Sequence, residues 1–145
     1  MKIRLYYLLP LLLVISTGCL KTPESTLPLS GPAGNFAGQF RLLHRSSARN
    51  KFDTLKTSLV LNLNLTNNSY SVTGDTAVLH AGSSGNFTIS SPYINFTDKT
   101  YPKSGIPAKT HLNGIYQYYY DGSVFQLLAF SADTLSFQYD LKKTQ

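Results

Sequence analysis

The feature that most constrains the fold is an alternation of apolar and polar residues between 53 and 65. Leucine recurs there at every second position, at 55, 59, 61, 63 and 65, with Thr57 completing the row. Thr, Lys, Ser and Asn alternate with this row, interrupted only by Val60. A period of two indicates a β-strand with one buried face. We find no 3.6-residue apolar stripe after the first eighteen residues, so the sequence predicts an all-β fold.

Similar short alternations, separated by turn-forming residues, continue through the chain. They predict eight or nine strands, at 35–45, 53–65, 70–73, 78–80, 86–90, 93–97, 111–120, 123–130 and 134–142. Asp121-Gly122 is the strongest hairpin signal. Ten Tyr, eight Phe and only 14% charged residues suit strands better than a helical bundle, and 145 residues suit one domain. We therefore expect an antiparallel up-and-down barrel of about eight strands.

The N-terminus has the pattern of an export signal. Lys2 and Arg4 precede an apolar stretch from 5 to 15 that is too short to span a bilayer and is interrupted by Pro10. Cys19 is the only cysteine, and it follows Ser-Thr-Gly. This arrangement resembles the lipobox of bacterial lipoproteins, which implies cleavage before Cys19 and its acylation, for example with palmitate. The alternative is a free or buried thiol in a cytoplasmic protein.

These observations divide the chain into three parts. Residues 1–18 are expected to be a lipoprotein signal peptide, 19–34 a lipidated cysteine with a Pro-rich flexible tether, and 35–145 the barrel domain. A Pro-rich tether extends about 3 Å per residue. No acidic pair follows Cys19, which among such lipoproteins implies the outer membrane, with the protein facing the periplasm.

The segment Gly-Asn-Phe-Ala-Gly-Gln-Phe at 34–40 resembles the first strand of lipocalin-like domains. Lipocalins begin with Gly-x-Trp, and Phe36 stands at the Trp position. No Arg occurs after Arg49, so the late Arg that stacks on that Trp has no counterpart here. The resemblance implies a lipocalin-like β-barrel. It leaves function open, because similar folds carry transport, inhibition, enzymatic and structural roles.

Two features suggest a ligand site. Alternate tyrosines in 111–120 form an aromatic row, and 98–110 is a long loop with two prolines and three lysines. The candidate contacts are Tyr116, Tyr118, Tyr120, Tyr101, Lys99 and Lys103. The alternatives are that the tyrosines simply fill the barrel and that the loop is solvated.

No residue pattern points to catalysis or to a cofactor. His44, His80 and His111 lack metal-ligand spacing, and four of the aspartates, at 53, 75, 121 and 133, sit beside turns that they can cap. We therefore expect no enzyme, no metal and no cofactor. The formal net charge of +6 includes no continuous Lys/Arg run, so nucleic acid is not an expected partner.

Three Asp-Thr-apolar triplets resemble the acceptor for O-glycosylation of exported proteins in one phylum of Gram-negative bacteria, which would modify Thr54, Thr76 and Thr134. The alternative is that Asp-Thr simply leads from a turn into a strand. Taken together, the sequence predicts a lipid-anchored periplasmic binding or interaction module, with a small apolar molecule as the candidate ligand. The alternative is a structural accessory subunit of a cell-envelope complex with a solidly packed barrel.

Overall fold

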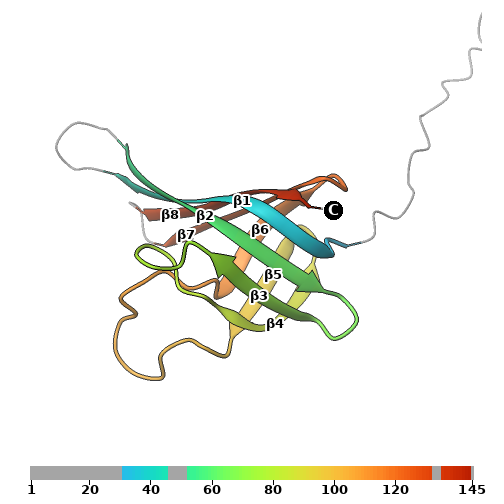
Figure 1. Ribbon diagram of the computed structural model, residues 1–145, viewed down its shortest axis with the longest axis horizontal. Coiled ribbons are helices and arrows are strands. Elements are labelled where there is room, and N and C mark those ends of the chain that lie inside the picture. Colours follow the sequence, from blue (N-terminus) through green and yellow to red (C-terminus); the bar gives the residue numbers. More distant parts are fainter. Residues whose placement is uncertain (1–30, 46–51, 132–134, 145) are drawn as a thin grey trace, which may run out of the picture.

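The computed structural model describes residues 31–45, 52–131 and 135–144, which form a closed barrel of eight antiparallel strands (Figure 1). The strands are β1 (Gly34–Arg45), β2 (Phe52–Asn64), β3 (Ser69–Gly74), β4 (Ser84–Ser90), β5 (Tyr93–Asp98), β6 (Gly114–Tyr120), β7 (Val124–Ser131) and β8 (Leu135–Lys143). Each pairs with the next along the chain, and β8 pairs with β1. The expected all-β, antiparallel up-and-down barrel of eight strands is confirmed, and it is consistent with the lipocalin-like resemblance.

The interior of the barrel is packed with aromatic and aliphatic side chains from all eight strands. On β2 the alternation places Leu59, Leu61 and Leu63 in the core. The same row predicts burial of Leu55 and Leu65, and this is wrong, because both are exposed. Pairing of β2 with β3 extends only from Leu59 to Asn64, so Leu55 is paired on one side alone, with Leu42 of β1, and Leu65 lies beyond the end of β2.

The two ends of the barrel differ. At one end, tight turns join the strands, and these include the cis Ser91–Pro92 bond between β4 and β5. Phe36 is fully buried near this end, and its ring centroid lies 5.1 Å from that of Phe125 and 5.8 Å from that of Tyr120. At the other end, the segments 75–83 and 99–113 form long loops, on the left in Figure 1. We call these the closed end and the open end.

The expected short strand at 78–80 is wrong. The chain there makes one isolated parallel bridge, His80 with Thr110, which joins the two loops of the open end. The backbone amide of Ala81 donates to the Thr110 carbonyl at 2.8 Å, and the backbone amide of Thr110 donates to the Leu79 carbonyl at 3.0 Å. A strand needs a partner along its length, and this segment crosses the open end instead of running beside a strand. The expected strand at 111–120 likewise begins only at Gly114.

The segment from residue 31 onward is a self-contained folding unit. It contains all eight strands and every core residue that the structure describes, and its last strand closes on its first. A chain with its own closed hydrogen-bonded sheet and core folds independently.

Candidate binding pocket at the open end of the barrel

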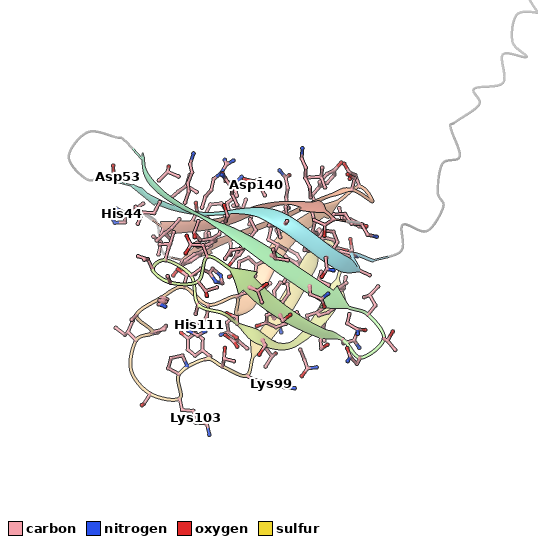
Figure 2. The ribbon with its side chains drawn as sticks, viewed as in Figure 1. His44, Asp53, Lys99, Lys103, His111 and Asp140 are labelled. Atoms are coloured by element: carbon pink, nitrogen blue, oxygen red, sulfur yellow. The ribbon has the colours of Figure 1, made fainter. Side chains whose placement is uncertain are left out.

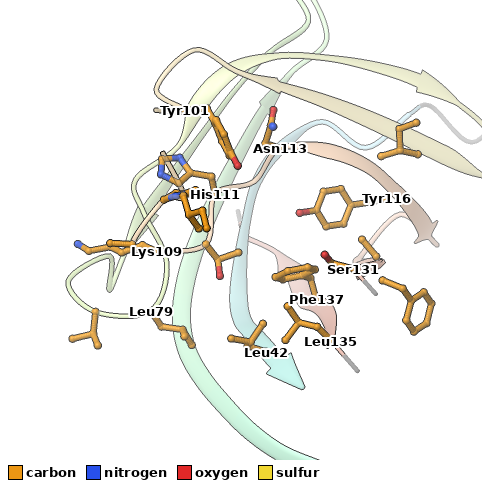
Figure 3. A pocket seen from close by; sticks show the side chains of 18 residues that line it. Leu42, Leu79, Tyr101, Lys109, His111, Asn113, Tyr116, Ser131, Leu135 and Phe137 are labelled. Atoms are coloured by element: carbon orange, nitrogen blue, oxygen red, sulfur yellow. The ribbon is translucent and has the colours of Figure 1, made fainter. Parts of the chain in front are cut away.

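A pocket of about 660 Å³ lies at the open end (Figure 3). Side chains from β1, from β6 to β8 and from both long loops line it. They are Leu42, Val78, Leu79, Tyr101, Ile106, Pro107, Ala108, Lys109, Thr110, His111, Asn113, Ile115, Tyr116, Ala129, Phe130, Ser131, Leu135 and Phe137. Figure 3 shows Tyr101, Lys109 and His111 on one side of the pocket and Leu42, Tyr116 and Phe137 on the other. The pocket therefore carries its ammonium and imidazole groups on the loop side, which we call the polar side, beside apolar loop residues such as Leu79 and Ile106, while its strand side is mainly apolar.

The pocket adjoins a seam between β6 and β7. These strands pair from Gln117 with Leu128 to Tyr120 with Phe125, and the described residues show no pairing nearer the open end. There, β6 pairs with β5 alone, down to Gly114, and β7 pairs with β8 alone, up to Ser131. Residues 115–116 and 129–131 on the two separated strand ends line the pocket. The pocket thus borders the unpaired ends of β6 and β7.

The floor of the pocket is a packed aromatic layer that fills the middle of the barrel. The ring of Tyr116 meets that of Tyr139 edge to face, with centroids 5.7 Å apart. The centroid of the Tyr139 ring in turn lies 4.8 Å from that of the Phe40 ring and 5.7 Å from that of the His80 ring. Burial raises the pKa of the Tyr116 phenol to about 12, and it also raises that of Tyr139. Both phenols therefore stay neutral and act as hydrogen-bonding groups.

His80 is fully buried beneath the pocket and connects the loop at 75–83 to β8. Its Nδ1 lies 2.6 Å from the Ala81 carbonyl, and its Nε2 lies 2.8 Å from the Tyr139 hydroxyl. A carbonyl only accepts, so Nδ1 carries the proton and Nε2 accepts from Tyr139. Burial lowers the His80 pKa to about 4, and the nearby His111 adds to this effect. His80 is therefore a neutral structural group at neutral pH.

Asp98 and His111 form a second buried polar pair, at the base of the loop at 99–113. The Asp98 carboxylate lies 2.7 Å from His111 Nδ1 and accepts hydrogen bonds from the backbone and hydroxyl of Thr100 at 2.7 and 2.6 Å. Burial alone would raise the pKa of this carboxyl, but these hydrogen bonds outweigh it and hold the pKa below its usual range. Asp98 thus fixes the orientation of the His111 ring, which lies 5.3 Å from Tyr101.

The sequence-predicted contacts are divided between the two ends. Tyr101 and Tyr116 line the pocket. Tyr118 and Tyr120 pack against Phe125 toward the closed end and do not line it. The structure places Lys99 and Lys103 on the outside of the loop at 99–113, exposed and not among the lining residues (Figure 2).

Sequence reasoning missed the pairing of Asp98 with His111 and the hydrogen bond from Lys109 to Thr76. Lys109 lines the pocket, and its Nζ donates to the Thr76 carbonyl at 2.8 Å. One local signal for Asp98 exists, because Asp-x-Thr at the end of a strand is typical of a side chain that bonds the backbone two residues on. No comparable signal in the sequence indicates that Asp98 pairs with His111, which lies thirteen residues further along the chain.

The remaining expectations concern modification and metals. Thr54 is exposed on β2 and Thr76 is half-buried in the loop at 75–83, while Thr134 and Cys19, the signal peptide and most of the tether lie outside the described residues. Among the residues that are described, no group of three or more His, Cys, Asp or Glu could hold a metal ion. The same ranges contain no helix of the length and apolar character that crossing a bilayer requires.

Comparison of the chain with protein-family models, with curated proteins and with solved structures gave no match.

Proposed function

We propose that this chain is a lipid-anchored binding protein that holds a small amphiphilic molecule in the pocket at the open end. The observation that carries the proposal is the pocket itself, with Lys109 and His111 on one side and Leu42, Phe137 and Ala129 on the other. Its volume of about 660 Å³ falls within the range of small-molecule sites. The polar side would receive the head of the ligand, and the strand side would receive its apolar part.

An anionic head suits the polar side best. Lys109 keeps donors beyond the one that bonds Thr76, because an ammonium group has three. His111 donates from Nδ1 to Asp98, so Nε2 of the neutral ring is an acceptor and could receive a hydroxyl of the head. The loop between 99 and 113 contains three lysines and no carboxylate. A carboxylate or phosphate head would therefore meet the ammonium donors of Lys109, while the Asp98 carboxylate at the base of the loop is already bonded to His111 and Thr100.

The anchoring part of the proposal rests on the sequence. Cleavage before Cys19 and acylation of that cysteine would tether the barrel to the outer membrane, facing the periplasm. The stretch between Cys19 and Gly34 would span up to roughly 45 Å if extended. In this proposal the chain is a carrier or receptor for its ligand and performs no chemistry on it.

A second candidate, a structural accessory subunit of the envelope, is favoured by a different observation. The middle of the barrel is filled by Phe40, Tyr139 and His80, so the pocket does not extend through the molecule. In this reading the open end would be a contact surface for another envelope protein.

A fluorescent fatty-acid probe titrated into residues 31–145 tests the binding proposal. We expect saturable binding that Ala129→Trp abolishes, because Ala129 lines the pocket and an indole there would fill it. The matched control is Gln126→Trp, which places the same ring on the exposed face of the same strand. Lys109→Ser should weaken binding most at low salt, since a pair with an anionic head is screened by ions. No saturable binding by the unaltered domain would favour the structural role.

A further inference from the structure

Large hydrophobic side chains are exposed around the mouth of the pocket. The structure describes nine such exposed residues in all, and five of these line the pocket. The five are Val78 (81% exposed), Tyr101 (40%), Ile106 (96%), Ile115 (67%) and Phe130 (74%). We call these five residues the apolar rim. They come from the loop at 75–83, the loop at 99–113 and the separated ends of β6 and β7.

The clustering of these residues requires an explanation. Single exposed apolar residues are common on soluble proteins, whereas a cluster around one opening marks an interaction surface. Ile106 is almost completely exposed, and it follows Gly105, whose φ of 80° belongs to a left-handed turn. The loop therefore carries an isoleucine near its tip that makes almost no contact with its own barrel.

The charges on the loop at 99–113 are positive, whereas the loop at 75–83 carries one exposed carboxylate, Asp75. The segment from 99 to 120 carries Lys99, Lys103 and Lys109 and no Asp or Glu. Asp98, which begins the loop, is buried and paired with His111. Asp53 lies on the opposite side of the same end from Lys103, as Figure 2 shows. The loop thus combines protruding apolar side chains with cations that point into solvent.

We propose that the apolar rim docks on a lipid bilayer that contains anionic headgroups. Ile106, Phe130 and their neighbours would enter the boundary between headgroups and acyl chains, and the lysines would contact the headgroups. Tyr101 suits this boundary, because its ring is apolar and its hydroxyl is polar. A bilayer with anionic headgroups fits this surface, because the exposed Lys99 and Lys103 accompany the apolar rim on the same loop.

Docking in this pose would place the mouth of the pocket and the seam between β6 and β7 against the bilayer. The inference rests on the exposure of the rim residues and on the lysines beside them, and it does not need the proposed ligand. It does not depend on Cys19 either, because the rim belongs to the folded barrel and lies at the end opposite the start of β1.

The test uses residues 31–145, so that no acyl chain or leader contributes to binding. Flotation is measured with vesicles of phosphatidylcholine alone and of phosphatidylcholine mixed with phosphatidylglycerol. We expect binding to the anionic vesicles, about tenfold weaker binding to the neutral ones, and a decrease with added salt. The double variant Ile106→Ser/Phe130→Ser should lose binding, and Lys99→Ser/Lys103→Ser should bind about tenfold more weakly. The matched control is Leu65→Ser/Tyr119→Ser, which alters two exposed hydrophobic residues outside the rim and should bind normally.

A direct reporter is available because the chain contains no tryptophan. Ile106→Trp introduces a single indole at the proposed point of insertion, and its emission should shift to shorter wavelength when anionic vesicles are added. Leu65→Trp, toward the closed end, should show no shift. Each variant is checked by its thermal unfolding curve.

The inference is overturned if the unaltered domain binds neither kind of vesicle or binds both equally. It is also overturned if the control variant loses binding as strongly as the rim variant. Self-association that requires Ile106 and Phe130, without binding to vesicles, would identify the surface as an interface between copies of the chain and would likewise overturn it.

Discussion

Acid should destabilise this barrel through the buried imidazole of His80. The ring is fully buried, its Nδ1 donates to Ala81, and its Nε2 accepts from Tyr139, so protonation would place an uncompensated charge in the core. Burial lowers its pKa from 6.5 to about 4 in the folded protein. The unfolded chain regains the ordinary pKa, because its imidazole is solvated.

The sign and size of the effect follow from these two values. Between about pH 6.5 and pH 4 the unfolded chain binds a proton at His80 that the folded chain does not bind. The free energy of unfolding therefore falls as the pH falls through this window. One pH unit corresponds to about 1.4 kcal/mol per proton, so His80 alone should remove about 3 kcal/mol by pH 4. Above pH 7 its contribution is complete and constant.

The assay is urea unfolding of residues 31–145 at a series of pH values from 7 to 4, for the unaltered domain and for His80→Gln. Glutamine retains an amide that can bond Tyr139 but does not titrate. The variant is expected to be less stable at pH 7. On acidification to pH 4, its free energy of unfolding should fall by about 3 kcal/mol less than that of the unaltered domain. Subtracting the two curves cancels groups that titrate in both proteins, such as Asp98. If the two curves run parallel between pH 6.5 and 4, His80 is not the buried neutral group argued above.

Four further predictions follow from single positions. Gly38→Ala should cost about 1–3 kcal/mol in urea unfolding, because a Cβ there would collide with a backbone carbonyl of β8 and disturb the closure of the barrel; an unchanged midpoint would contradict this contact. Leu61→Asp buries a charge in the core and should lower the melting temperature by far more than a substitution on the exposed face of β2, and equal melting would mean that the two faces are assigned wrongly. Asp98→Asn removes the charge that pairs with His111, so trypsin should cleave the loop at 99–113 faster, and an unchanged cleavage rate would show that Asp98 does not hold the loop. Cys19→Ser should abolish incorporation of labelled palmitate, and labelling at the normal level would refute acylation at this residue.

The strands could be predicted from the sequence because their signals are local. A period of two places alternate side chains on opposite faces whatever the rest of the chain does, and Asp121-Gly122 encodes its hairpin within two residues. Leu61 and Tyr139 are buried as their alternation predicts. The limit of this signal is visible at Leu55, which belongs to the same row but is exposed, because burial depends on how far β3 extends beside β2.

The candidate site could be predicted only in part. The sequence indicated the loop after β5 and the tyrosines of β6, and of these Tyr101 and Tyr116 line the pocket. Tyr118 shares the inward-facing row of Tyr116 but lies nearer the closed end. An alternating pattern specifies a face of a strand and carries no information about the depth at which the interior is filled.

The sequence by itself determined the strands, their order and the turns of the closed end, since each depends on residues close together in the chain. Only the tertiary structure decided the pairing of Asp98 with His111, the bond of His80 to Tyr139, and the seam between β6 and β7. Each of these requires two or three segments to meet at a particular register, which is set by closure of the whole barrel. The pocket and its apolar rim belong to this second group, because they are assembled from strand ends and loops that become neighbours only when β8 closes on β1.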